Sequence, residues 1–176
     1  MKLVRLFSLF IIVVVLASPT QVLAQSPQSP LNDETDQVET FESVVEYDLN
    51  DPQMAANRVL DITGATGCKG YTLGIKGSNY AGVMLWKYSW TINWCYNGTT
   101  ITSVQKYRTV WVNWSWNFRR DISDDSSGGV GQTSYSHYGQ GEFCFINVGV
   151  CVAYSYPWVS QTVRGNGTYS GSAGGD

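Results

Sequence analysis

Aromatic side chains are the residues of this chain best suited to hold a ligand. Six of its seven tryptophans lie between Val83 and Trp116. Indole and phenol rings can stack on sugar rings, and they also anchor protein interfaces. The competing role is a hydrophobic core, because one face of a strand takes every second residue. Large apolar side chains occupy alternate positions at Met84, Trp86, Tyr88, Trp90, Ile92, Trp94 and Tyr96. We expect this row to be buried from Met84 to Trp94.

Three other tryptophans are candidates for ligand binding. Trp114 and Trp116 share one strand parity, which is opposite to that of Trp111. If Trp111 shares the buried face with the row above, then Trp114 and Trp116 point outward. Trp158 follows Pro157 in a predicted turn and is the third candidate. The predicted partner of Trp114, Trp116 and Trp158 is an extracellular glycan or a protein surface.

Carboxylates offer a weaker case for catalysis. A glycosidase needs two carboxyl groups about 5–10 Å apart. Asp121 and Glu142 meet this requirement only if their strands pair. Asp124 and Asp125 lie in a Ser/Gly-rich stretch that is typical of a solvated turn or a loose calcium site. We therefore predict no catalytic residue and keep a secreted polysaccharide hydrolase as an alternative.

Other chemistry is not indicated. His137 is the only histidine, and the nucleophile pattern G-x-S-x-G is missing from the sequence. The sequence also contains no phosphate loop or dinucleotide motif, and we predict no cofactor. A domain that is only weakly basic gives no reason to expect nucleic acid as a partner.

Four cysteines indicate two disulfide bonds, and their wide spacing argues against zinc. Cys144 and Cys151 flank the short segment FINVGV, which reads as a turn between strands. We pair these two, which leaves Cys68 with Cys95. The second bond would tie the start of the domain to the tip of a central hairpin.

The N-terminal third differs in amino-acid composition from the rest of the chain. Residues 1–24 have a basic start and a short apolar run, as in a signal peptide, so we expect secretion and no membrane anchor after cleavage. Residues 25–50 are Pro/Ser-rich and then acidic, and we expect them to be disordered, apart from a weak helix near 38–46. Residues 51–67 predict a short helix and a linker. From Gln25 to Gly67 there are nine acidic residues and one basic residue. This segment could fold back on the rest, act as a pro-segment, or remain a solvated leader.

Residues 68–170 predict an all-β domain, and residues 171–176 a flexible tail. Asn97-Gly98 favours a two-residue hairpin turn, in which paired residue numbers add to 195, so Tyr88 would face Tyr107. Lys87 would then face Arg108, a repulsion that a β-bulge would relieve. Further strands are predicted at 130–137, 141–148 and 150–163. The pattern favours an antiparallel β-sandwich or a small barrel.

Three segments carry a resemblance to known proteins: LWKYSWTINWCYNGTTITSV, GGVGQTSYSHYGQGEFCF and YPWVSQTVRGNGTYSGSAGG. They resemble small secreted proteins of unknown function from Gram-positive bacteria, mostly actinomycetes, over about Cys68 to Gly175. The resemblance implies an exported bacterial β domain and assigns no catalytic residue. Three functions stay open: a non-catalytic binding domain, a polysaccharide hydrolase, and an interbacterial effector held inactive by an acidic pro-segment.

Overall fold

The chain folds into two antiparallel β-sheets. A computed structural model describes residues 37–49 and 60–175. The predicted signal peptide, the Pro/Ser linker and most of the predicted short helix lie outside these residues. The nine strands are β1 (Gln37–Tyr47), β2 (Gly67–Ser78), β3 (Met84–Tyr96), β4 (Ile101–Val112), β5 (Trp116–Gly128), β6 (Ser134–Asn147), β7 (Val150–Ser155), β8 (Trp158–Arg164) and β9 (Tyr169–Gly174).

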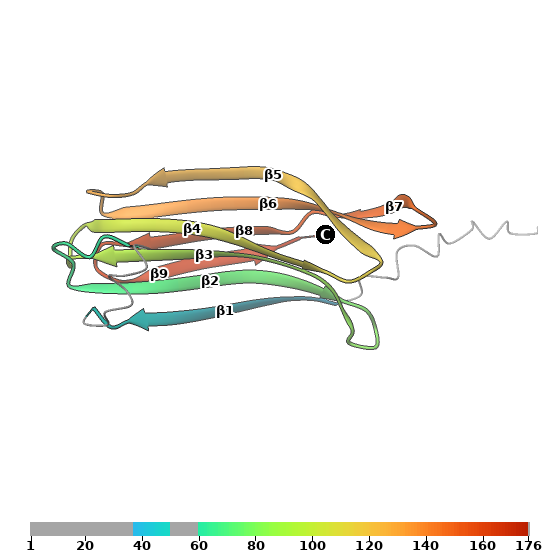
Figure 1. Cartoon of the computed structure of the whole chain (residues 1–176), viewed down its shortest axis with the longest axis horizontal. Helices are drawn as coiled ribbons and strands as arrows, with labels where there is room; N and C mark the ends of the chain where they lie inside the picture. The colour runs from blue at the N-terminus through green and yellow to red at the C-terminus, as the bar shows by residue number, and fades with distance from the viewer. Residues whose placement is uncertain (1–36, 50–59, 176) are drawn as a thin grey trace, which may run out of the picture.

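Sheet A has the strand order β1-β2-β3-β4, and sheet B has the order β5-β6-β8-β9 with β7 added beside β6. In Figure 1, sheet A runs upward from β1 at the bottom, while β8 and β9 pass behind it. Contacts of β8 and β9 with β2 and β3 join the two layers. The predicted all-β fold is therefore confirmed, as an antiparallel sandwich. Within the described residues, no helix is long and apolar enough to cross a membrane.

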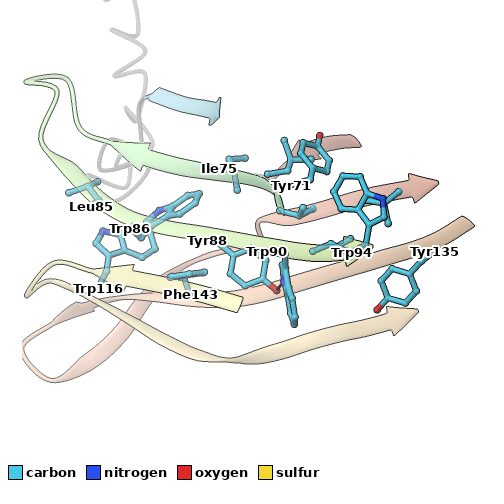
Figure 2. Close-up of a cluster of buried hydrophobic side chains, with 14 of the residues drawn as sticks. Tyr71, Ile75, Leu85, Trp86, Tyr88, Trp90, Trp94, Trp116, Tyr135 and Phe143 are labelled. Carbon is cyan, nitrogen blue, oxygen red and sulfur yellow. Dashed lines mark hydrogen bonds between the residues drawn. The ribbon is translucent and has the colours of Figure 1, made fainter. Parts of the chain in front are cut away.

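The alternating row on β3 forms the centre of the core, as predicted. Trp86, Tyr88 and Trp94 have no measurable exposure, and Trp90 is 4% exposed. Figure 2 shows these rings between the sheets, with Phe143 next to Trp86 and Tyr88. Aromatic packing of this kind supplies most of the apolar burial that stabilises a sandwich.

The register of the central hairpin differs from the prediction. Tyr88 pairs with Val110, so paired numbers add to 198 and not to 195. One cause is Asn97, whose Oδ1 accepts hydrogen bonds from the backbone N of Thr99 (3.0 Å) and Thr100 (2.9 Å) and so lengthens the turn. A bulge between Cys95 and Tyr96 accompanies the longer turn.

The shift is two residues at Ile101 and three beyond the bulge, and this odd total exchanges the faces of β4 from Ser103 onward. Trp111 therefore points outward and is 43% exposed, which corrects its predicted burial. Lys87 now faces Trp111, and Arg108 faces Trp90. The predicted repulsion between Lys87 and Arg108 is relieved in this way.

The acidic segment is ordered where the structure describes it. Residues 37–47, expected to be disordered or weakly helical, form β1 along the edge of β2. Glu46 pairs with Lys69 (2.9 Å), and Glu39 pairs with Lys76 (3.1 Å). The opposite charges of the two parts of the chain meet here, so this segment folds back on the domain. A pro-segment role remains a prediction.

Several strand boundaries also differ. The predicted strands 130–137 and 141–148 merge into one strand, β6, which covers only residues 134–147 and continues through Gly139 and Gly141 beneath the rings of Trp90 and Tyr88. The predicted strand 150–163 is split at Pro157, which has no N–H to continue the ladder. The tail was expected to be flexible from residue 171, but β9 pairs with β8 as far as Gly174.

Both predicted disulfides are confirmed. Cys68 is bonded to Cys95 across β2 and β3, and Cys144 is bonded to Cys151 across the β6–β7 hairpin. The first bond is buried with Leu60 in a small cluster outside the main core. The second fixes a hairpin that projects at one end of the sandwich (Figure 1).

Candidate functional site

Three turns meet at the end of the sandwich where the β6–β7 hairpin projects. They join β2 to β3, β4 to β5 and β6 to β7 (Figure 1). Together they surround a hollow of about 600 Å³, which we call the loop-end hollow. It is lined by Asn79, Val83, Leu85, Asn113, Trp114, Ser115, Phe145, Ile146, Asn147 and Val148. Every one of these residues is uncharged.

Trp114 is the most exposed tryptophan of the molecule, at 93%. Its turn is held from both sides. Asn113 Oδ1 accepts hydrogen bonds from the backbone N (3.0 Å) and the Oγ (2.8 Å) of Ser115. The backbone N of Asn113 donates to Leu85 O (2.9 Å), and Ser115 O accepts from the backbone N of Ile146 (2.7 Å). Because these hydrogen bonds anchor the turn to β3 and β6, they fix the backbone that carries the exposed indole.

The β2–β3 turn is built in the same way. Asn79 Oδ1 accepts hydrogen bonds from the backbone N of Ala81 (3.1 Å) and Val83 (2.9 Å). Gly82 takes a positive φ of 76°, which glycine adopts without strain. As the amide oxygens of Asn79 and Asn113 are used within their turns, the Nδ2 groups are the parts of these amides suited to donate to a ligand.

The third wall contains a strained residue. Val148 has a φ of +51°, which is unusual for a β-branched side chain, and it is 95% exposed. Such a conformation costs on the order of 1–3 kcal/mol. The Val148 side chain is too exposed to contribute to the core, and it lies beside the hollow.

The hollow combines a flat aromatic face, aliphatic side chains and amide groups. These groups suit a neutral ligand that has both apolar C–H faces and hydroxyl or carbonyl groups. A phosphate or carboxylate would find no cationic side chain among the lining residues. Pockets for small ligands commonly have volumes of about 300–1,000 Å³, which includes this one.

Of the three predicted aromatic candidates, the hollow contains only Trp114. Trp116 is 5% exposed and packs against Trp86 and Phe145, so the prediction of its exposure is wrong. The turn after β4 ends sheet A, and Trp116 begins β5 in sheet B. Strand parity therefore does not carry from Trp114 to Trp116.

Trp158 lies elsewhere, on the outer face of sheet B. It is half-buried and alternates with Val159, which points into the core. Its ring lies beside that of Tyr138, with centroids 6.3 Å apart and an interplanar angle of 24°. Trp114 and Trp158 therefore belong to two separate surfaces.

The carboxylates do not form the pair that a hydrolase requires. Asp121 is ion-paired with Arg108 at the inner edge of β5, whereas Glu142 bonds Arg120 (3.0 Å) on the outer face of sheet B. Burial raises the pKa of Tyr88 to about 12, so its phenol stays protonated and donates to Asp121 (3.1 Å). Asp121 and Glu142 thus lie on opposite faces of one sheet and cannot flank a single glycosidic bond.

His137 also lacks the surroundings of a general base. It is 2% exposed, and its Nδ1 lies 3.2 Å from Ser126 Oγ and 3.0 Å from Asp125 O. Its Nε2 is buried without a hydrogen-bond partner among the described residues. In a catalytic triad the serine and the carboxylate engage different ring nitrogens. Here the neighbouring groups gather at one nitrogen, with Lys106 Nζ also 3.4 Å away.

Burial lowers the pKa of His137, and the charge of Lys106 lowers it further. The ring is therefore a neutral part of the core, with its centroid 4.3 Å from that of Trp90 and its plane tilted by 59°. Within residues 37–49 and 60–175, no group of three His, Cys, Asp or Glu residues could hold a metal ion.

Sequence reasoning found Trp114 but missed the walls around it. The signal for Val148 was present in the segment Asn147-Val148-Gly149, whose composition is typical of a tight hairpin turn. Nothing in the sequence indicated that the β2–β3 turn would lie beside this hairpin. Comparisons with protein-family models, curated proteins and solved structures found no match for this chain.

Proposed function

We propose that this protein is a non-catalytic binding domain that holds a neutral glycan in the loop-end hollow. The observation that carries the proposal is Trp114, which is 93% exposed at the margin of an uncharged hollow with amide groups. The indole would stack on a sugar ring, and the amides of Asn79 and Asn113 would donate to its oxygens.

We place this function outside the cell. The N-terminal segment has the pattern of a signal peptide, and two disulfides suit an oxidising compartment. A glycan of a cell surface or of the extracellular matrix would be accessible there.

The test is a glycan array followed by titration of the best oligosaccharide. We expect Trp114→Ala to weaken binding about tenfold or more, equivalent to about 1.4 kcal/mol. The matched control is Trp111→Ala, because Trp111 is also exposed but lies on the outer face of sheet A. Equal binding by wild type and Trp114→Ala would exclude the hollow as the glycan site.

A protein partner is the second candidate, and the apolar rim favours it. Val83 and Val148 are 54% and 95% exposed beside Trp114. Exposed apolar groups clustered at loop tips are typical of protein contacts. If the array shows no binding, and Trp114→Ala abolishes capture of a defined extracellular protein, then the partner is a protein.

A further inference from the structure

The outer face of sheet B carries a second set of groups suited to a ligand. Trp158 pairs with Gly174 of β9, and a Cβ at Gly174 would lie 2.9 Å from the indole ring. Because glycine has no side chain, the indole can lie flat over β9. The ring of Tyr138 lies beside it on β6 and is tilted from it by only 24°, so two neighbouring strands present an aromatic surface.

A shallow depression of about 200 Å³ lies next to Tyr138. It is lined by Asp125, Ser126, Ser127, Ser136, His137, Tyr138 and Ser160. Strand register places Asp125 directly opposite Tyr138, and Tyr138 directly opposite Ser160, so these three residues form a row across three strands. The depression therefore has an aromatic wall, several hydroxyl groups and one carboxylate.

The carboxylate differs from the other acidic residues of β5. Asp121 and Asp124 point toward sheet A and are ion-paired with Arg108 and Lys106. Asp125 is exposed and accepts a hydrogen bond from the hydroxyl of Ser123. A hydroxyl-bonded carboxylate on an open face is a good acceptor for the hydroxyl groups of a sugar.

We infer that this face is a second glycan site, which binds several consecutive residues of a neutral oligosaccharide. Sugar rings stack on Trp158 and Tyr138, and the next residue enters the depression and donates hydroxyl protons to Asp125. The carboxylate disfavours uronic acids, sulfated sugars and phosphorylated sugars. This site shares no lining residue with the loop-end hollow, so it stands whether or not the hollow binds a glycan.

The arrangement of the two surfaces also assigns different parts of a glycan to them. Three turns enclose the loop-end hollow, which suits a single residue or a chain end. The outer face of sheet B is open along the strands, which suits an internal stretch of a chain. Two sites on one domain would raise the apparent affinity for an insoluble polysaccharide through effective concentration.

The experiment is calorimetric titration of the secreted protein with cellohexaose, chitohexaose and mannohexaose. Variants Asp125→Asn and Trp158→Ala test the second site, and Trp111→Ala is the control. Asp125→Asn is isosteric and exposed, so it keeps the fold even if Trp158→Ala disturbs β8. We expect Asp125→Asn to weaken binding of at least one hexasaccharide about tenfold, with Trp111→Ala unchanged.

The variant Trp114→Ala separates the two sites. If it leaves hexasaccharide binding intact while Asp125→Asn reduces it, the second site is supported independently of the hollow. Loss of binding in Trp114→Ala with full binding in Asp125→Asn and Trp158→Ala overturns the second site and retains the first. No heat of binding with any of the three hexasaccharides also overturns it.

Discussion

Arg108 of β4 and Asp121 of β5 form an ion pair across the open side of the sandwich, where the edge strands of the two sheets face each other. The guanidinium also lies over the ring of Phe118, 4.6 Å from its centroid. Lys106 and Asp124 make a second pair between the same strands. Inward-pointing charges on edge strands oppose further strand addition, so these pairs both close this side and protect it from aggregation.

The first prediction concerns this pair. Arg108→Ala leaves the partly buried carboxylate of Asp121 without its cation, and we expect a loss of about 1–2 kcal/mol in the free energy of unfolding. The control is Arg120→Ala, since Arg120 is 73% exposed in its pair with Glu142 and should cost less than about 1 kcal/mol. Urea denaturation measures both. Equal losses for the two variants would show that the Arg108–Asp121 pair stabilises the fold no more than the exposed Arg120–Glu142 pair does.

The second prediction concerns Val148. Replacing it with asparagine, which tolerates positive φ better, should raise the free energy of unfolding by about 1 kcal/mol. The same change removes an apolar group from the margin of the loop-end hollow, so we expect weaker ligand binding. Val150→Asn is the control, because Val150 is 62% exposed on the same hairpin but does not line the hollow. A stabilised variant with full binding would mean that the strain serves no contact.

The sequence was informative wherever alternation alone decides a position. The row from Trp86 to Trp94 and both disulfides were predictable, because burial follows strand period and Cys144 and Cys151 flank a short turn. Alternation did not predict the faces of residues beyond a turn, because the length of the turn and any bulge beside it change the strand parity. Asn97 lengthened its turn through two side-chain hydrogen bonds, and the bulge beside the turn made the total shift odd, so the faces of β4 beyond the bulge were exchanged.

The candidate site was less predictable for a related reason. Trp114 could be identified as exposed, but the hollow depends on which turns of the folded chain lie at the same end. That is decided by strand order, which a single sequence does not encode locally. The acidic segment shows the same limit: its composition is typical of disorder, yet Glu39 and Glu46 find lysines on β2.

The third prediction compares the two disulfides. The bond between Cys68 and Cys95 closes 27 residues, and that between Cys144 and Cys151 closes seven. Loop-closure entropy then gives contributions of about 3.6 and about 2.4 kcal/mol. We expect the midpoint temperature of thermal unfolding to fall further for Cys68→Ala/Cys95→Ala than for Cys144→Ala/Cys151→Ala. The reverse order would show that the β6–β7 hairpin, and not the start of the domain, limits stability.

The fourth prediction concerns pH. His137 is buried, and its pKa lies below the ordinary value of 6.5 because of burial and the nearby Lys106. Below about pH 6.5 the unfolded chain therefore binds a proton that the folded protein resists. Above that pH His137 should not lower the free energy of unfolding. As the pH decreases toward the pKa of His137 in the folded protein, the free energy of unfolding should fall. The variant His137→Gln cannot titrate, so its stability should depend less steeply on pH in this window.

The comparison isolates His137, because the carboxylate ion pairs of Arg108 and Lys106 are present in both proteins. Urea denaturation of wild type and His137→Gln between about pH 7.5 and about pH 5 measures the two slopes. Identical slopes would contradict a neutral buried ring. A steeper slope in wild type would confirm that the imidazole stays uncharged between Trp90 and β5, where its Nδ1 meets the carbonyl of Asp125.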